Sequence, residues 1–284
     1  MTRTASNIQP SDQPATAQLI QPVVKPSREP SQKLAFARRA FLPLALVAAW
    51  AAATTSGCVP PSILPSPSDL VTGFQLLWSE QQLTTQSLVS LTRAAVGGAI
   101  GISIGLILGI TAGLSRLGEE FLDSFLQMLR TIPFLALVPL FIVWFGVGEF
   151  PKLLLIIMAT AFPMYLNAYG GVRNVDRKLL EAMRSFGLTG FRLVREVVIP
   201  SALPQIFTGL RYSLGVSVLV LIGAEQINTS QGLGYLLNSA QLYQQVDVIL
   251  ICIAIYALLG LSADLITRSL EKIFMPWRVS VAAR

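Results

Sequence analysis

The sequence contains no histidine and only two cysteines, Cys58 and Cys252, among its 284 residues. Without histidine and without a cysteine cluster, the common routes to nucleophilic and metal catalysis are missing. The phosphate-loop pattern Gly-x-x-x-x-Gly-Lys-Ser/Thr is also absent, which excludes ATP binding by that cradle of backbone amides. These absences argue against an enzyme, and we expect no metal and no bound cofactor. The two cysteines are weak evidence for a disulfide.

Charged residues are scarce too, at 13% of the chain, whereas 53% is hydrophobic and the mean hydropathy is +0.62. This composition is too apolar for a soluble globule of this length, so a bilayer is the expected solvent. A membrane-spanning helix needs about 20 apolar residues. Five intervals without charge are candidates: 41–68, which is apolar only as far as Cys58, 94–115, 131–148, 153–172 and 248–263. With a weaker interval between Arg211 and Glu225, the predicted fold class is an all-α polytopic membrane protein with six transmembrane helices.

The orientation is predicted from basic residues, because short loops rich in Lys and Arg stay in the cytoplasm. Six basic residues lie between Arg3 and Arg39, and six between Arg173 and Arg195, whereas residues 59–90 and 228–246 hold none. Six spans then place both termini in the cytoplasm. Arg93 and Lys152 fall toward the outer side and are exceptions. The net charge of +6 is read as a topology signal, and no nucleic-acid partner is expected.

Residues 1–38 are rich in Pro, Gln, Ser and Thr, which predicts a disordered cytoplasmic tail. Residues 39–83 are expected to hold the first transmembrane helix and an extended outer, periplasmic linker with four prolines: Pro60, Pro61, Pro65 and Pro67. A lipoprotein cleavage box is a weaker interpretation of residues 55–58, because the basic region before it is long and Thr55 stands where such boxes usually place Leu. We therefore expect an uncleaved first span.

Glycine recurs every four residues within the second predicted span, at Gly97, Gly101, Gly105, Gly109 and Gly113. This side-chain-free ridge predicts close helix packing in lipid, where the hydrophobic effect does not drive helices together. The pattern does not say whether the neighbouring helix belongs to the same chain. Three prolines interrupt the third and fourth spans, which fits either broken helices along a pathway or simple kinks: Pro133, Pro139 and Pro163.

A charged, glycine-punctuated segment, EAMRSFGLTGFRLVREVVIP, occupies residues 181–200 between two apolar blocks. We expect Asp176 to cap a helix that Gly187 ends, with an apolar stripe of Leu179, Leu180, Met183 and Phe186. A second short helix is predicted from Phe191 to Val198, ending before Pro200. One face of this helical hairpin would rest on the membrane domain and the other would meet a cytoplasmic partner. An amphipathic helix lying on lipid headgroups is the alternative.

The hairpin resembles the cytoplasmic signature of the inner-membrane permeases of binding-protein-dependent ABC importers. That signature reads Glu-Ala-Ala, three residues, Gly, nine residues, then Ile-x-Leu-Pro. This chain has Glu181-Ala182-Met183, three residues, Gly187, nine residues, then Val197-Val198-Ile199-Pro200. Met183, Val197 and Ile199 are conservative departures. Segments such as GLSRLGEEFLDSFLQMLRTIP and GLRYSLGVSVLVLIGAEQI resemble the sulfonate, taurine and nitrate subgroup, and most of all the aliphatic sulfonate permeases.

The resemblance implies a type I ABC importer permease fold in a bacterial inner membrane. Its transmembrane domain would span residues 84–268 with a coupling loop at 173–203, and residues 269–284 would form a cytoplasmic tail. The implied partners are cytoplasmic ABC ATPase subunits, a periplasmic substrate-binding protein, a second copy of the permease and membrane lipid. The residues implied in ATPase coupling are Glu181, Ala182, Met183, Gly187, Ile199 and Pro200.

Transport by alternating access is the mechanism that the resemblance implies, with aliphatic sulfonates as the first substrate class and taurine or nitrate as alternatives. Weak candidates for an anion pathway are Arg130, Asn167, Arg211 and Gln226. Arg130 and Arg211 also fit the simpler role of interfacial anchors. A secondary transporter and a membrane scaffold remain rival interpretations. A secondary transporter usually carries intramembrane acids, whereas Glu225, Asp247 and Asp264 fall near predicted span ends.

Overall fold

The computed structural model describes residues 32–57, 59–80, 82–115, 118, 128, 133–226 and 229–276. The chain divides into two compact units, Met1–Ala49 and Trp50–Arg284. The described part of the first unit belongs to helix α1 (Gln32–Thr55). Most of the tail predicted for residues 1–38, the last eight residues of the tail predicted for 269–284, and Arg130 lie outside the described residues.

Part of the predicted extended linker is helical. Helix α2 (Pro67–Ser79) begins at Ser66, whose Oγ accepts a hydrogen bond from the Asp69 amide while the Asp69 carboxylate accepts one from the Ser66 amide. Hydrogen bonding of the Asp69 carboxylate with the side chain and the amide of Ser66 holds the pKa of Asp69 below its ordinary value. The prediction is wrong from Pro67 onward because a reciprocal capping box starts a helix here, and proline is well tolerated in the first turn.

Four helices are long and apolar enough to cross a membrane, judged by length and composition. They are α3 (Gln82–Leu114), α7 (Glu149–Arg173), a continuous helix Gly190–Glu225 that ends in α10 (Ile199–Glu225), and α12 (Val246–Phe274). Each contains one of the predicted spans. Helix α3 has 33 residues, so at about 1.5 Å per residue it measures about 50 Å and exceeds a hydrocarbon layer of about 30 Å.

Shorter apolar helices represent the first and third predicted spans. They cover Leu44–Thr55, within α1, and Phe134–Phe145, which combines the 3₁₀ turn η2 (Phe134–Leu137) with α6 (Val138–Phe145). Pro133 precedes η2, and Pro139 lies in the first turn of α6, where a missing amide hydrogen leaves no helix bond unmade. Every regular element in the described ranges is helical, as the all-α class requires.

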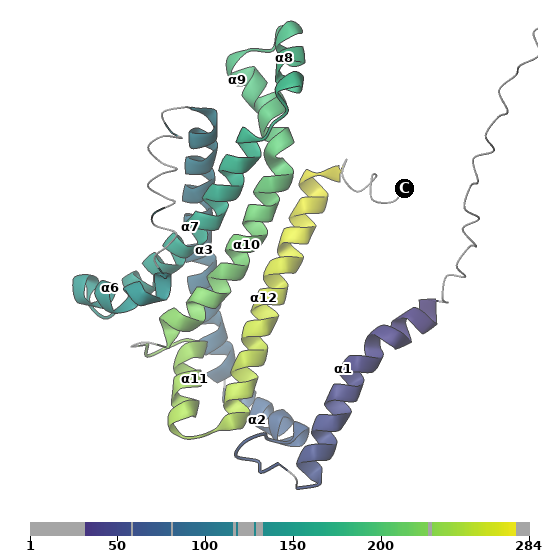
Figure 1. The fold of residues 1–284 in the computed structure, drawn as a ribbon. Coiled ribbons are helices and arrows are strands. Elements are labelled where there is room, and N and C mark those ends of the chain that lie inside the picture. The colour runs from purple at the N-terminus through teal and green to yellow at the C-terminus, as the bar shows by residue number, and fades with distance from the viewer. Residues whose placement is uncertain are drawn as a thin grey trace, which may run out of the picture. The chain divides into compact units, whose positions relative to one another are not determined.

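The long helices of the second unit run alongside one another (Figure 1). Helix α7 packs against both α3 and α10, and α10 also contacts α12. Helix α11 (Leu233–Leu242) contacts α3, α10 and α12 at one end of these helices. At the opposite end, α8 (Arg177–Ser185) and α9 (Gly190–Leu193) project from the bundle (Figure 1). The fold therefore places the charged hairpin of α8 and α9 at one end of the bundle and the short helix α11 at the other.

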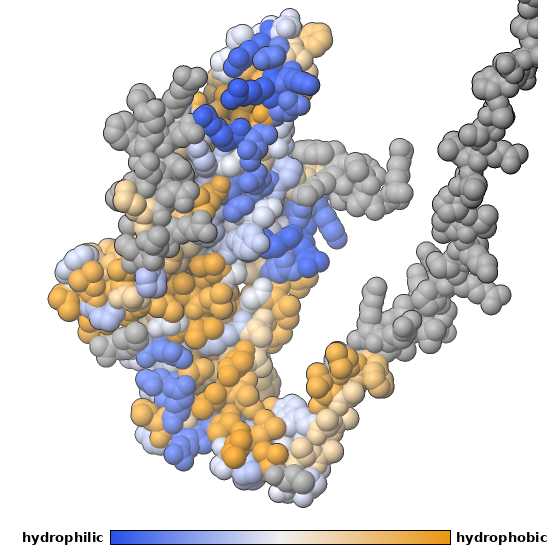
Figure 2. Space-filling view, in the orientation of Figure 1, coloured by the Kyte–Doolittle hydropathy of each residue, from blue (hydrophilic) through white to orange (hydrophobic). Residues whose placement is uncertain are grey.

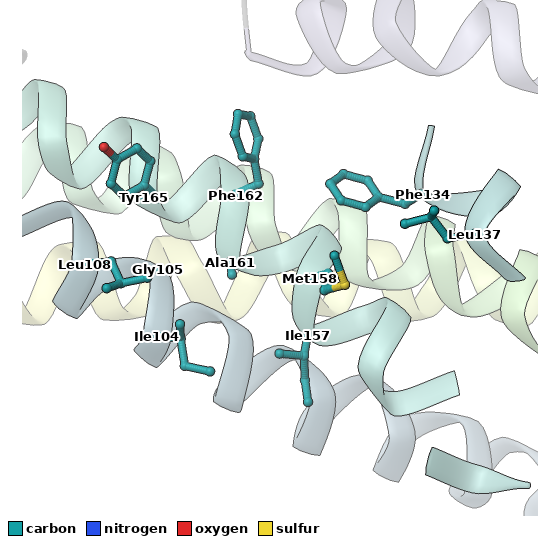
Figure 3. Close-up of a pocket in the computed structure, with 10 residues that line it drawn as sticks. All are labelled: Ile104, Gly105, Leu108, Phe134, Leu137, Ile157, Met158, Ala161, Phe162 and Tyr165. Carbon is teal, nitrogen blue, oxygen red and sulfur yellow. The ribbon is translucent and has the colours of Figure 1, made fainter. Parts of the chain in front are cut away.

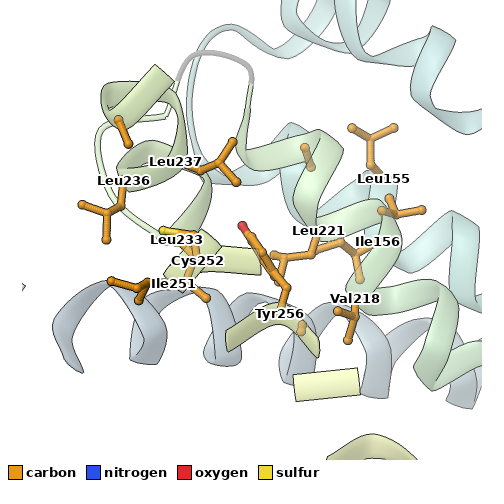
Figure 4. Packing of buried hydrophobic residues seen from close by; sticks show 14 of the residues in the cluster. Leu155, Ile156, Val218, Leu221, Leu233, Leu236, Leu237, Ile251, Cys252 and Tyr256 are labelled. Atoms are coloured by element: carbon orange, nitrogen blue, oxygen red, sulfur yellow. The ribbon is translucent and has the colours of Figure 1, made fainter. Parts of the chain in front are cut away.

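Buried apolar side chains form two clusters along the bundle. The cluster that includes Leu221, Leu233 and Tyr256 lies beside α11 (Figure 4). The second includes Met164 and Val198 and lies toward the hairpin. Large apolar side chains also stay exposed over the long helices, and Figure 2 shows them gathered around α6, whereas polar residues gather over the hairpin. Exposing such a surface to water would cost about 25 cal/mol per Å², a cost that lipid removes.

Candidate functional site

Helix α8, the first helix of the hairpin, has local capping interactions at both ends. The Asp176 carboxylate accepts a hydrogen bond from the Lys178 amide at 2.9 Å, so the predicted N-cap is confirmed. At the other end the Leu188 amide donates to the Met183 carbonyl at 3.1 Å. Gly187 lies between them with φ +86°, the left-handed conformation that glycine adopts without strain. The predicted helix stop at Gly187 is confirmed.

The side chains of α8 separate onto three faces. The first lines a basic pocket against the ends of α3 and α7 and consists of Arg177, Leu180 and Arg184. The second lines a groove shared with the start of α10 and consists of Leu179 and Met183. The third, called the outer face below, is exposed and consists of Lys178, Glu181, Ala182 and Ser185. Two of the predicted coupling residues, Glu181 and Ala182, therefore lie on the outer face, and Met183 lies in the groove.

Two aromatic side chains flank the turn of the hairpin in exposed positions. Phe186 is 80% exposed and Phe191 is 77% exposed. The prediction that Phe186 continues the apolar stripe is wrong, because it is the C-cap residue, where the chain leaves the helix before Gly187. Leu180, by contrast, packs against the second buried cluster. Exposed aromatic rings beside a charged face are typical of a protein interface.

The predicted helix end before Pro200 is also wrong. Helix α9, the π-helical turn η3 (Val194–Val198) and α10 form one continuous helix from Gly190 to Glu225. The Ile199 amide donates to the Val194 carbonyl five residues earlier, and Pro200 lies in the first turn of α10. The wider π turn accommodates a residue that has no amide hydrogen, so the helix passes through the proline. Ile199 and Pro200 thus join the hairpin to a membrane-spanning helix.

The model of the family described as binding-protein-dependent transport system inner membrane component matches residues 101–274, more than half of the chain. The chain belongs to this family. The protein named as an aliphatic sulfonates transport permease, SsuC of Escherichia coli (strain K12), is 46% identical, covering 84% of this chain and 90% of that protein. The taurine transport system permease TauC of the same strain is 33% identical, covering 83% and 88% respectively.

Solved structures share the fold of this permease. The methionine ABC transporter MetNI, in an inward-facing conformation, aligns with a TM-score of 0.55 at 20% identity, covering 69% of this chain and 97% of that chain. An amino acid ABC transporter aligns with a TM-score of 0.57 at 19% identity, covering 70% and 96%. The predicted family and the all-α importer permease fold are confirmed by these comparisons.

The five ridge glycines of the permease lie against α7 of the same chain. A Cβ atom added at Gly97 would stand 2.8 Å from Ile156 Cγ2, and one at Gly109 would stand 2.6 Å from the Tyr165 carbonyl oxygen. At Gly101 the added atom would meet the Ile157 carbonyl oxygen at still closer range. The contacts of Gly105 and Gly113 are also with α7. The backbones of α3 and α7 therefore touch, and the neighbour that the sequence left open is in this chain.

The described pathway candidates of the permease are not gathered in one place. Arg211 donates to Glu271 at 2.8 Å and lies 3.4 Å from Asp264, both on α12. Asn167 donates its amide to the Pro163 carbonyl within its own helix. Gln226 follows the end of α10, about 22 Å beyond Arg211 along the helix axis at about 1.5 Å per residue. Within one copy of the permease these three side chains do not build a common anion site.

An apolar pocket of about 260 Å³ lies between α3, η2 and α7 (Figure 3). Phe134, Phe162 and Tyr165 line it together with Ile104 and Leu108. Such walls suit an alkyl group and offer little to an oxyanion, which needs donors or positive charge. The predicted pathway residues in the described ranges do not line this pocket.

A buried ionic network, which was not predicted from the sequence, lies at the α11 end of the bundle. The carboxylate of Glu225, on α10, is buried and accepts hydrogen bonds from four donor groups. The donors are Ser90 Oγ at 2.7 Å, Arg93 Nη1 at 2.7 Å, the Gly234 amide at 3.0 Å and the Tyr256 hydroxyl at 3.0 Å. They come from α3, α11 and α12, so one carboxylate joins four helices and has the partners that offset its desolvation.

Arg93 extends the network to α7. Its Nε and Nη2 atoms donate to the Glu149 carboxylate at 2.5 Å and 2.6 Å, and Lys152 Nζ lies 3.3 Å from the same carboxylate. Arg93 and Lys152, the two exceptions to the positive-inside pattern, are therefore both paired with acids. That exception was the signal available in the sequence, because a basic residue within a span needs a partner. Gly232, with φ +112°, completes the enclosure, since a Cβ there would stand 2.5 Å from Arg93 Nη1.

Proposed function

We propose that this permease is the membrane subunit of an ATP-driven importer for aliphatic sulfonates in a bacterial inner membrane. The observation that carries the substrate class is the 46% identity to SsuC over 84% of the chain. The lower identity of 33% to TauC makes taurine, which also bears a sulfonate group, the next candidate. Nitrate is the third substrate expected from the sequence resemblance.

The outer face of α8 is proposed as the surface that docks on a separate ATPase subunit. Glu181 and Ala182 are exposed there, and Phe186 and Phe191 stand beside them as aromatic anchors. Gly187 fixes the turn between Phe186 and Phe191. The surface is thus polar at its centre and apolar at its tip, which suits a groove that accepts a short helix.

The connection from the hairpin to α10 provides a mechanical route for coupling. Because residues 190–225 form one continuous helix, a displacement of α9, the second arm of the hairpin, moves α10 without an intervening loop. Leu180 links α8 itself to the buried cluster between α7 and α10. We infer that two permease copies enclose the pathway and that ATP-driven motion of their hairpins alternates its open side. A periplasmic binding protein would deliver the sulfonate to the outward-open state.

The orientation proposed for the permease places the hairpin and both termini in the cytoplasm. Residues 173–195 carry six basic residues and residues 228–246 carry none, as the positive-inside rule requires. The paired states of Arg93 and Lys152 support this orientation, because the two exceptions are neutralised by Glu149 and Glu225. The network and α11 then lie at the periplasmic end.

Uptake of radiolabelled alkanesulfonate tests the proposal, in cells that produce the permease with its ATPase and binding protein. We expect Glu181→Arg to abolish uptake and to reduce ATPase retention on the purified permease, because it reverses the charge at the centre of the outer face. Glu80→Arg is the matched control: it makes the same charge change at an exposed position at the other end of the bundle. This control is expected to retain the ATPase.

The outcomes separate substrate from coupling. Uptake of taurine or nitrate without alkanesulfonate would overturn the substrate class but retain the importer. Normal uptake and normal ATPase retention in Glu181→Arg would overturn the role of the outer face.

A further inference from the structure

The basic pocket beneath α8 is a second site on the hairpin, separate from the outer face. It has a volume of about 410 Å³ and lies between the hairpin and the ends of α3 and α7. Three arginines line it, Arg173 at the end of α7 and Arg177 and Arg184 on α8. Arg177 and Arg184 lie seven residues apart, two helical turns, so both point to the same side of α8.

The positive charges of Arg177 and Arg184 are not balanced by the acids of the hairpin. Within the described ranges, Arg177 and Arg184 form no ion pair, and the residues that line the pocket include no Asp or Glu. Asp176, next to Arg177, directs its carboxylate to the Lys178 amide. Glu181 lies on the outer face and Glu196 lines the groove on the other side of α8. The pocket therefore attracts an anion.

Part of the pocket lining is apolar, which restricts the kind of anion that it fits. This part, called the apolar wall below, includes Leu114 at the end of α3 together with Val172 and Val198 from the second buried cluster. An inorganic ion would leave this wall without a partner. An amphiphile with an anionic head and an apolar chain would satisfy both parts, and the pocket lies where two membrane-spanning helices end.

We propose that this pocket binds an anionic phospholipid, with the headgroup phosphate at Arg177 and Arg184 and the adjoining chain against the apolar wall. The proposal rests on the cytoplasmic orientation given above, because basic pockets at the cytoplasmic ends of transmembrane helices are sites for anionic headgroups. Arginine suits a phosphate because its planar guanidinium donates two parallel hydrogen bonds. The bound lipid would lie between α8 and the helix ends, and would fix the hairpin against the membrane domain.

Native mass spectrometry of the purified permease–ATPase complex tests the proposal, with phosphatidylglycerol and phosphatidylcholine added in equal amounts. We expect selective retention of phosphatidylglycerol. In the double variant Arg177→Gln/Arg184→Gln, the ratio of bound to free phosphatidylglycerol should fall about 30-fold, the effect of removing two interfacial charges. The matched control is Arg192→Gln/Arg195→Gln, which removes the same charge from exposed positions of the hairpin outside the pocket. It should retain the lipid.

A third variant, Arg177→Lys/Arg184→Lys, keeps the charge and should keep most of the lipid, which distinguishes lost binding from a damaged hairpin. Equal loss in the pocket and control variants, or no loss in either, would overturn the proposal. Binding of radiolabelled inorganic phosphate that depends on Arg177 and Arg184, without selectivity for phosphatidylglycerol, would replace the lipid by a free anion. The readout needs no transport, so it can fail while the importer function stands.

Discussion

At the scale of single residues, the ridge positions of α3 require glycine because α7 occupies the space that a side chain would need. At Gly101 the space that a side chain would need is occupied by the carbonyl of Ile157, in a neighbouring helix that cannot rotate away as a flexible side chain can. Gly260 on α12 has no atom within 4 Å of an added Cβ. Gly101 therefore does not tolerate a larger side chain, whereas Gly260 does. Sequence spacing alone does not predict this difference in the cost of substitution.

Gly101→Ala is expected to lower the stability of the permease by about 1–3 kcal/mol, the usual cost of overpacking a close contact. Gly260→Ala is the control, and a stabilisation of about 0.5–1 kcal/mol is expected because alanine is the better helix former. Thermal unfolding of the two purified variants in the same detergent measures the difference. Equal stability of the two variants would show that α3 and α7 separate readily and that the close contact contributes little.

At the scale of elements, the buried network joins helices that are far apart in the sequence. The side chains of Arg93 and Glu225 are only 5% and 0% exposed, so removal of one leaves the other in a site shielded from bulk solvent. If Glu225 is removed, Glu149 remains a partner for Arg93, but Ser90 and Tyr256 lose their hydrogen-bond acceptor. The network thus holds α3, α10 and α12 in one arrangement at this end.

Glu225→Leu is expected to cost about 3–5 kcal/mol of folding free energy, because it removes one member of a buried ion pair. The double variant Arg93→Met/Glu225→Leu should recover part of that loss, since it leaves less charge uncompensated. Arg211→Met is the comparison: its ion pairs with Asp264 and Glu271 are partly exposed, so a cost below about 1 kcal/mol is expected. Denaturant unfolding of the purified protein gives all three values. Similar costs for Glu225→Leu and Arg211→Met would contradict the importance of burial.

The element boundaries show what local sequence can predict. Asp176 and Gly187 act on amides within a few residues of themselves, so the ends of α8 could be predicted. The same local rule applies at Ser66 and Asp69, whose reciprocal hydrogen bonds start α2, although the density of prolines before them favours an extended linker. The helix end predicted before Pro200 is wrong for another reason. The π turn Val194–Val198 lowers the free-energy cost of a proline in the helix, and no residue type in that turn predicts a π conformation.

At the scale of the whole molecule, the long uncharged intervals predicted the membrane helices because hydrocarbon imposes one simple requirement on length and polarity. The hairpin was predicted from its motif, whose spacing is kept despite three conservative changes. The ionic network could not be assembled in this way. Ser90 and Glu225 are 135 residues apart in the sequence, and only packing of α3 against α10 brings them together. Arg93 and Lys152, the exceptions to the positive-inside pattern, indicated the location of the network but did not identify Glu149 and Glu225 as their partners.

The orientation of the molecule gives the last prediction, and single cysteines placed on the two ends test it. Cys252 is buried, so Cys58→Ser provides the background for new exposed cysteines. Phe186→Cys lies on the hairpin and Ser79→Cys at the end of α2, both at exposed positions. With the hairpin in the cytoplasm, a membrane-impermeant maleimide should label Ser79→Cys in intact cells and Phe186→Cys only after permeabilisation. Labelling of Phe186→Cys in intact cells would place the hairpin outside, beyond the reach of any ATPase, and would remove the basis for coupling through α8.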